Sequence, residues 1–414
     1  MATKARQALE EVQEYFSGYP RYKFEKEAGK GAQGIAVCFS DTGENQNGWK
    51  KFIVKVQYSK GDLEKEAGHL QRLRWAKHIV SIFKLDPNPF TLPHLTASPF
   101  QRPYIFQEYL ENGTLSDLAD RYSMLRGGRL PNRILWAVFF CLVRSITALA
   151  YPPGDPNIGP RYPSEKLSET VPLDTNSYPA GSLVHGDIHT KNIMFGEIER
   201  PSFNPQHPRP IFEHERIPIV KLIDFGSAKN MRFEEVAYEV GLSWRYDIIL
   251  DLAAKKKAEE ARNSRVDLPA EPNSDIQPDT IGQHGWDNPF VFTNAPYARS
   301  YATGFNIGII GAVMTSLITD DPDVWSALLA RPVMLEFMNQ RRNSGLDPNL
   351  DEDLLELVAR CIANEPTNRP ELSQLLSLLQ GYMYMKTEQA YPGNNDETDA
   401  NIDSVLQEFM FDVS

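Results

Sequence analysis

Cysteine is scarce in this chain of 414 residues, which contains only Cys38, Cys141 and Cys361. Three widely separated cysteines exclude a disulfide framework and a zinc site built from clustered cysteines, and they favour a reducing compartment. A basic excess is also lacking, because the formal net charge is −12. Non-specific nucleic-acid binding needs a basic surface, so we expect no nucleic-acid partner.

Long hydrophobic runs are lacking as well. The most apolar stretch, ILWAVFFCLV at 134–143, meets Arg144 after ten residues. This is too short to span a bilayer and is typical of a buried helix. The opening residues, MATKARQALEEVQEYF, have the mixed charge of a surface helix rather than the pattern of a signal peptide. We therefore expect an intracellular protein, cytoplasmic or nuclear, without a membrane span; its oligomeric state stays open.

The length of the chain favours two lobes. Residues 22–110 are rich in strand patterns such as WKKFIVKVQY, whereas residues 111–384 carry helix periodicity, as in LPNRILWAVFFCLVRSITALA. We predict an α+β fold with a small β-rich N-lobe and a larger helical C-lobe.

Several segments lie outside this two-lobed pattern. Residues 1–21 predict an N-terminal helical extension, and residues 385–414 form an acidic tail that we expect to be flexible, with room for a short helix at DSVLQEFMF. Loop-like or polar composition predicts mobile surface insertions near 152–181, 196–218 and 252–290.

The stretch GKGAQG places Gly29, Gly31 and Gly34 between two strand patterns. Glycine lets the backbone turn tightly and present N–H groups to phosphate oxygens. A dinucleotide-binding fold would place a helix after these glycines, whereas IAVCF continues as a strand. The pattern therefore favours a hairpin over phosphates, and an ordinary hairpin turn is the alternative.

Lys55 lies inside the apolar strand FIVKV. A lysine there needs a carboxylate partner or exposure to solvent. Glu66 on the following helix is the favoured partner, because Leu70 and Leu73 follow it on the core side; Glu64 is its rival.

The most informative stretch is LVHGDIHTKNIMF at 183–195. In this loop Asp187 is placed to accept or orient the proton of a hydroxyl nucleophile, and Asn192 offers an amide oxygen to a divalent cation. Further on, IVKLIDFG places Asp224 at the end of an apolar strand, where a carboxylate can hold Mg²⁺ on a nucleotide. A turn or a helix cap is the ordinary role of a single aspartate, but these elements in this order indicate phosphoryl transfer.

Together these motifs resemble the protein kinase family over roughly residues 22–384. The resemblance implies ATP and Mg²⁺ as cofactors, a protein substrate and, by family frequency, serine or threonine as the acceptor. It implies that Gly29, Gly31 and Gly34 cover the phosphates, that Lys55 pairs with them and with Glu66, and that the backbone around Glu108 and Leu110 meets adenine. Asp187 then matches the catalytic aspartate, and Asn192 and Asp224 match the metal ligands.

The sequence departs from the family at several positions. Gly186 replaces the usual arginine, which predicts activity that does not depend on activation-loop phosphorylation. His189 stands where a lysine is usual, and Lys191 is placed to meet the γ-phosphate instead. No Ala-Pro-Glu appears, since the nearest match is Ala295-Pro296-Tyr297, and Asn306 replaces a buried aspartate.

These departures leave two alternatives to a protein kinase. One is a pseudokinase that binds nucleotide without turnover. The other is a small-molecule kinase of the aminoglycoside or choline kinase type, which the His-Gly-Asp loop also resembles.

Overall fold

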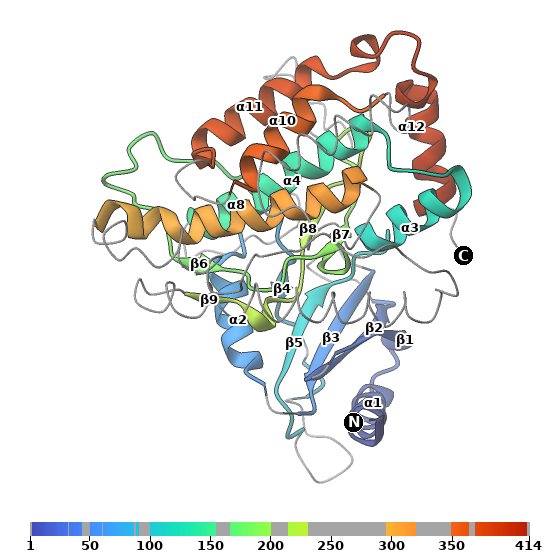
Figure 1. The fold of residues 1–414 in the computed structure, drawn as a ribbon. Coiled ribbons are helices and arrows are strands. Elements are labelled where there is room, and N and C mark those ends of the chain that lie inside the picture. The colour runs from blue at the N-terminus through green and yellow to red at the C-terminus, as the bar shows by residue number, and fades with distance from the viewer. Residues whose placement is uncertain are drawn as a thin grey trace, which may run out of the picture. The chain divides into compact units, whose positions relative to one another are not determined.

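The computed structural model describes most of the chain outside its long insertions (Figure 1). The described residues are 2–31, 33–43, 50–59, 61–86, 88–90, 100–154, 166–199, 214–230, 295–319, 349–363 and 369–411. The chain divides into two compact units, the first made of residues 1–115, 151–170 and 185–228 and the second of residues 116–150, 171–184 and 229–414. The predicted α+β composition is confirmed at this level, with an antiparallel sheet near the N-terminus and a helical C-terminal region.

An antiparallel sheet of order β1-β2-β3-β5-β4 forms the centre of the first unit. Its strands are β1 Tyr22–Lys30, β2 Gly34–Asp41, β3 Lys51–Gln57, β4 Ile82–Phe83 and β5 Tyr104–Glu108. Helix α2, Leu63–Arg72, follows β3. The alternation of β-branched and charged residues in β3 buries Val54 and Val56 completely and leaves Lys55 between them half-buried. The strand therefore carries a charged side chain between two core positions.

Helix α1, Ala2–Ser17, confirms the predicted N-terminal helix and packs into the core of the sheet. Its buried positions Ala5, Ala8, Val12 and Phe16 follow the helical repeat of three to four residues. The Phe16 ring stacks on Phe39, with 4.1 Å between the ring centroids. The helix is thus a structural part of the first unit.

A short hairpin completes the first unit. It joins β7, Ile193–Phe195, to β8, Val220–Leu222. Leu222 exchanges backbone hydrogen bonds with the segment after α2, because its N–H donates to the His78 carbonyl and its carbonyl accepts from Val80, both at 3.0 Å. The end of β8 is therefore held against the residues that follow α2.

The second unit is mainly helical. Its elements are α3 Leu115–Arg126, α4 Asn132–Ala150, α8 Ala295–Thr319, α10 Glu352–Cys361, α11 Leu372–Met385 and α12 Asp399–Leu406, with β6 Leu183–Val184 paired to β9 Lys229–Asn230. Helices α4 and α8 are long and apolar enough to cross a membrane by length and composition alone, but 94% and 72% of their apolar windows are buried inside the protein. This burial is compatible with the expected lack of a membrane span.

The expected flexibility of the tail is wrong, whereas the short helix expected at DSVLQEFMF is confirmed by α12, Asp399–Leu406, and the helical turn that follows it. Residues 386–411 form 3-10 turns, α12 and a π-helical turn, Gln407–Phe411, that pack on the second unit. Glu397 is buried and accepts the N–H groups of Asn132 and Arg133 at 2.6 and 3.0 Å, so it caps the N-terminus of α4. The acidic composition of the tail serves this capping and an ion pair of Asp399 with Arg133.

Most described residues of the insertion predicted near 152–181 are exposed or half-buried, as expected, but two residues of the predicted insertions are buried. Glu169, in the insertion near 152–181, and His214, in the insertion near 196–218, have exposed fractions of 0% and 1%. The insertion near 252–290 lies outside the described residues.

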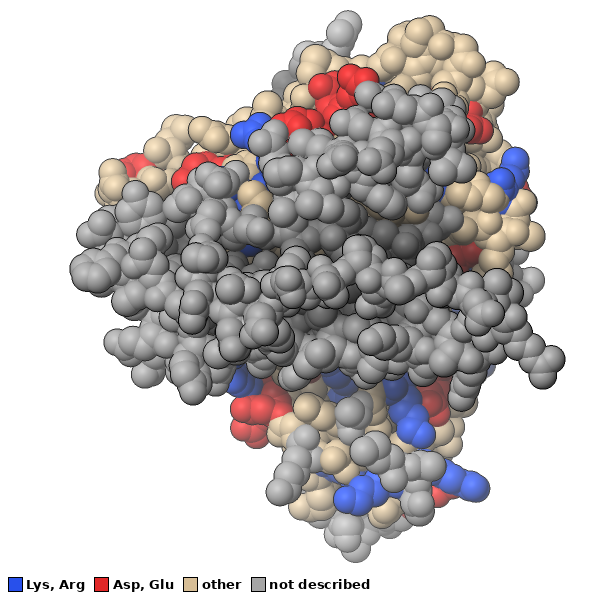
Figure 2. Space-filling model, in the orientation of Figure 1, with Lys and Arg blue, Asp and Glu red and all other residues tan. Residues whose placement is uncertain are grey.

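Figure 2 shows Lys and Arg side chains interspersed with Asp and Glu on the described surface.

Candidate functional site

Lys55 lies at the centre of a group of charges in the first unit. Its ammonium lies 2.8 Å from both carboxylate oxygens of Glu66 and 2.7 Å from Oδ1 of Asp224. Of the two partners that the sequence left open, the structure selects Glu66, which is buried, whereas Glu64 is exposed. Helix α2 makes this selection, because Leu63, Glu66 and Leu70 share its inner face.

Burial and charge pairing act in opposite directions on the protonation of this group, and at Glu66 burial prevails and raises the pKa despite the Lys55 ammonium. Burial alone would lower the pKa of Lys55, but the carboxylates of Glu66 and Asp224 outweigh it and raise that pKa. Burial alone would raise the pKa of Asp224, and the Lys55 ammonium outweighs it and lowers that pKa. The single ammonium of Lys55 therefore pairs with two carboxylates, so the site carries an excess of negative charge.

Asp224 has an unusual backbone. Its φ of 58° is the only positive value at a non-glycine residue in the described part of the chain. An aspartate in this left-handed region costs on the order of 1–2 kcal/mol. Its Oδ1 accepts from Lys55 and, at 3.3 Å, from the N–H of Gly226 in the turn Phe225–Ser227. Such strain is concentrated at functional sites, so the conformation marks Asp224 as a candidate.

The loop at 185–192 brings Asp187 and Asn192 together. The Asn192 amide donates to the backbone carbonyl and to Oδ2 of Asp187, both at 3.0 Å. His189 lies 3.5 Å from Oδ1 of Asp187, and its hydrogen bond holds the pKa of that carboxyl below the usual range. The negative charge of Asp224 acts in the opposite direction on the pKa of Asp187, but the hydrogen bond from His189 prevails. Lys191 is exposed in the turn Thr190–Asn192.

His185 connects the two loops, a role that the sequence did not reveal. It is fully buried, its Nε2–H donates to the Ile223 carbonyl at 2.9 Å, and its Nδ1 accepts from the Asp187 N–H at 3.3 Å. Burial lowers the pKa of His185 to about 4, so the ring is neutral. It also packs edge-on against Phe225. One imidazole thereby positions Asp187 relative to Ile223, which follows β8 and precedes Asp224.

The structure explains why residue 186 is a glycine, which the sequence alone did not show. Its φ is 79°, and a Cβ at this position would lie 2.5 Å from the Ser227 carbonyl oxygen. Only glycine meets both conditions without strain. The lack of an arginine here therefore follows from the close approach of the loop at 185–192 to residues 224–227.

The glycine-rich stretch forms a tight hairpin between β1 and β2. The Gly31 N–H donates to the Gly34 carbonyl at 3.0 Å, and Tyr58 donates its hydroxyl to the Gly31 carbonyl. A Cβ on Gly34 would lie 2.8 Å from the Val56 carbonyl oxygen, whereas a Cβ on Gly29 would meet no atom within 4 Å. Packing thus explains Gly34 but not Gly29 or Gly31, and the question of a phosphate over the hairpin stays a prediction.

Glu108 and Leu110 were expected to present backbone groups to adenine. The Glu108 N–H instead donates to the Ser81 carbonyl at 3.0 Å, and both its carboxylate oxygens accept from Lys221 at 2.8 Å. Leu110 is buried. The described contacts of Glu108 are internal, so its backbone N–H and its side chain stabilise the first unit.

Two features of the second unit bear on the departures from the kinase pattern. Ala295-Pro296-Tyr297 begins the long helix α8, and the Asn306 amide in the same helix donates to the Leu183 carbonyl at 3.0 Å. By the kinase resemblance, Arg369 would lack its usual carboxylate partner because Tyr297 stands in place of the glutamate; it donates to the carbonyls of Ala363 and Gly304. Backbone carbonyls are therefore among the partners of Arg369.

Comparison with known proteins adds no assignment. No protein-family model matches the chain, and a search of curated proteins found no match. A function therefore has to be argued from the chemistry of the residues above.

Proposed function

We propose that this chain is an ATP-dependent phosphotransferase with a two-lobed, protein-kinase-like fold, which transfers the γ-phosphate of Mg·ATP to a serine or threonine hydroxyl of a protein substrate. The observation that carries the proposal is the Lys55 ammonium between Glu66 and the strained Asp224. These three groups come from strand β3, helix α2 and a turn after β8. Asp224 lies 169 positions after Lys55 in the chain. Such an arrangement suits the binding of phosphates beside a cation.

The donors fit a divalent cation. Asp224 and Asn192 offer carboxylate and amide oxygens, which are the ligands that Mg²⁺ prefers. With Lys55, Glu66 and Asp187 the site contains one ammonium and three carboxylates, a net charge of about −2 at neutral pH, which a bound cation would offset. When bound, Mg²⁺ would neutralise charge on the phosphates of ATP.

Each residue then has a chemical role. Lys55 holds the α- and β-phosphates, and Glu66 keeps its ammonium in place. Asp224 and Asn192 hold the cation. Asp187, kept ionised by His189, orients the acceptor hydroxyl and accepts its proton, and the exposed Lys191 meets charge on the γ-phosphate.

Gly29, Gly31 and Gly34 would present N–H groups to the phosphates from the hairpin between β1 and β2. The open space around Gly29 supports this role, because a Cβ there would meet no atom within 4 Å. Glu108 and Leu110 would contribute to the nucleotide site through main-chain carbonyls. The Glu108 N–H already donates to the Ser81 carbonyl.

A small-molecule acceptor is the second candidate. Gly186 and His189 favour it, since the His-Gly-Asp loop followed by His189 resembles that of the aminoglycoside and choline kinase group. The two candidates share the chemistry of transfer and differ in the acceptor.

The test is phosphoryl transfer from γ-labelled ATP by the full chain with Mg²⁺, using mixed protein acceptors and a panel of aminoglycosides and amino alcohols. We expect Asp187→Asn, Asp224→Asn and Lys55→Met each to reduce transfer by about 10²–10⁴-fold with the fold retained. Lys51→Met is the matched control, because Lys51 is an exposed lysine of the same strand.

Three outcomes decide between the hypotheses. Label on proteins supports the protein kinase, and label on small molecules supports the second candidate. Mg·ATP binding without transfer to any acceptor or to the chain itself would refute the enzyme and leave a pseudokinase. Full activity of Lys55→Met would show that the phosphate lysine lies elsewhere.

A further inference from the structure

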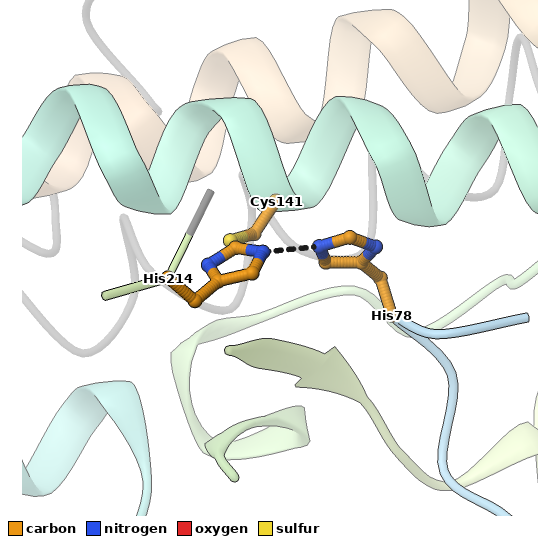
Figure 3. Close-up of side chains that lie close together, drawn as sticks. All are labelled: His78, Cys141 and His214. Atoms are coloured by element: carbon orange, nitrogen blue, oxygen red, sulfur yellow. Dashed lines mark hydrogen bonds between the residues drawn. The ribbon is translucent and has the colours of Figure 1, made fainter. Parts of the chain in front are cut away.

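Two buried histidines of the first unit face one another. His78 lies in the segment after α2, and His214 lies in the described end of an insertion (Figure 3). Their Nε2 atoms are 3.1 Å apart, and their exposed fractions are 0% and 1%. Cys141, also labelled in Figure 3, belongs to the second unit.

Glu169 fixes the orientation of the His78 ring. One of its oxygens lies 2.6 Å from Nδ1 of His78, and the other accepts the His78 backbone N–H at 2.8 Å. A carboxylate only accepts hydrogen bonds, so Nδ1 of His78 carries a proton. The lone pair of a neutral His78 ring then lies on Nε2, toward His214.

Two arrangements account for nitrogen atoms at this separation. In one, Nε2–H of His214 donates to Nε2 of His78. In the other, both lone pairs bind one cation. Two ligands of a tetrahedral ion with bonds of about 2.0–2.1 Å lie about 3.3–3.4 Å apart, close to the observed 3.1 Å.

We propose that His78 and His214 bind a divalent transition-metal ion, best matched by zinc, through their Nε2 atoms, with Glu169 holding His78 in the correct tautomer. A histidine ligand whose second ring nitrogen donates to a carboxylate is the usual arrangement around protein-bound zinc. Imidazole nitrogens favour zinc over Mg²⁺, which prefers oxygen ligands. The site is therefore distinct from the oxygen-rich group around Asp224.

The contacts around the two histidines indicate a structural role. Residues 75–80 already receive hydrogen bonds from the insertion near 152–181, because Lys166 donates to the Ala76 carbonyl and Leu167 donates to that of Trp75. In the other insertion, Glu199 donates its N–H to the His214 carbonyl at 2.9 Å. A metal ion between His78 and His214 would join these segments by stronger bonds.

The same ion would support the strand that leads to Asp224. The Leu222 N–H donates to the His78 carbonyl at 3.0 Å, and Leu222 precedes Asp224 by two positions. Metal binding at His78 would thus restrain the segment on which β8 rests. Zinc would stabilise the fold of the first unit without touching the reacting groups.

The test is the metal content and zinc affinity of the full chain, purified without a histidine tag and equilibrated with zinc against a competing chelator. We expect about one zinc ion per chain in the wild type, and its loss in His78→Ala and in His214→Ala. Glu169→Gln should weaken zinc affinity about 10–100-fold while keeping the stoichiometry. His69→Gln, a buried histidine in α2, is the matched control and should bind zinc as the wild type does.

A second measurement does not depend on the folding of any variant. Zinc should raise the thermal unfolding midpoint of the wild-type chain, a chelator should reverse the shift, and Mg²⁺ should not produce it. The proposal is overturned if the wild-type chain binds no zinc when zinc is supplied in excess over the chelator. The contact between His78 and His214 would then be an N–H···N hydrogen bond alone. Zinc uptake that is unchanged in His214→Ala would overturn the proposal equally.

Discussion

Replacing Glu108 by alanine tests the buried ion pair at the end of β5. Glu108 and Lys221 are 6% and 8% exposed in their side chains, and the ammonium lies 2.8 Å from both carboxylate oxygens. Glu108 also accepts from the N–H and the hydroxyl of Ser81, at 2.6 and 2.8 Å. Burial alone would raise the pKa of Glu108, and Lys221 outweighs it and lowers that pKa. The substitution would therefore leave a buried ammonium without this carboxylate.

The expected magnitude follows from desolvation. Removing one partner of a buried pair costs about 3–5 kcal/mol, because the remaining charge is buried without compensation. Replacing both partners by apolar residues of similar volume, as in Glu108→Leu with Lys221→Met, should be much less costly than the sum of the single changes. We expect each single variant to lose about 3–5 kcal/mol and the double variant to lose less than either.

Urea denaturation followed by circular dichroism, at pH 7.5, measures these differences. Arg6→Ala is the control, because the exposed pair of Arg6 with Glu10 in α1 is worth only about 0.3–0.5 kcal/mol. The reasoning would be refuted by a loss below about 1 kcal/mol in Glu108→Ala, or by additive losses in the double variant.

Two further predictions concern the loop at 185–192. Gly186→Ala should lower the thermal unfolding midpoint more than Gly127→Ala. Both glycines have positive φ values, 79° and 75°, but only a Cβ at position 186 would meet a neighbour, Ser227. Equal shifts of the midpoint would show that the close approach is relieved without cost. The pKa of His185 is lowered to about 4 from an ordinary value of 6.5, so its stabilising contribution is complete above pH 6.5 and is lost as the pH falls toward 4. The free energy of unfolding should fall by roughly 1.4 kcal/mol per pH unit in that range on this account, and His185→Gln should flatten the profile.

Local patterns made much of the fold predictable. The period of three to four in α2 places Glu66 on the same face as Leu70, so spacing favoured Glu66 as the partner of Lys55 but left Glu64 as an alternative. The buried helix α4 and the N-terminal helix were predictable for the same reason. These features depend on neighbours in sequence, which a periodic pattern records directly.

The candidate site was predictable only in part. The composition of the loops indicated Asp187, Asn192 and Asp224, but the positive φ of Asp224 and the requirement for glycine at 186 arise where two loops meet. The role of His185 was hidden because its contacts with Ile223 and Phe225 join residues about forty positions apart, which a single histidine in a sequence does not indicate. The tail was misjudged, since acidic composition alone does not show that Glu397 caps α4.

The sequence by itself determined the order of strands and helices, the helix face that carries Glu66 and the identity of the phosphate-site candidates, because each depends on residues a few positions apart. Only the tertiary structure decided that Glu108 pairs with Lys221, that Glu169 and His214 are buried beside His78, and that the tail is ordered. These contacts join residues separated by 91 to 265 positions. Such pairs form where distant segments fold together, and burial then raises the energy of every polar group that lacks a partner.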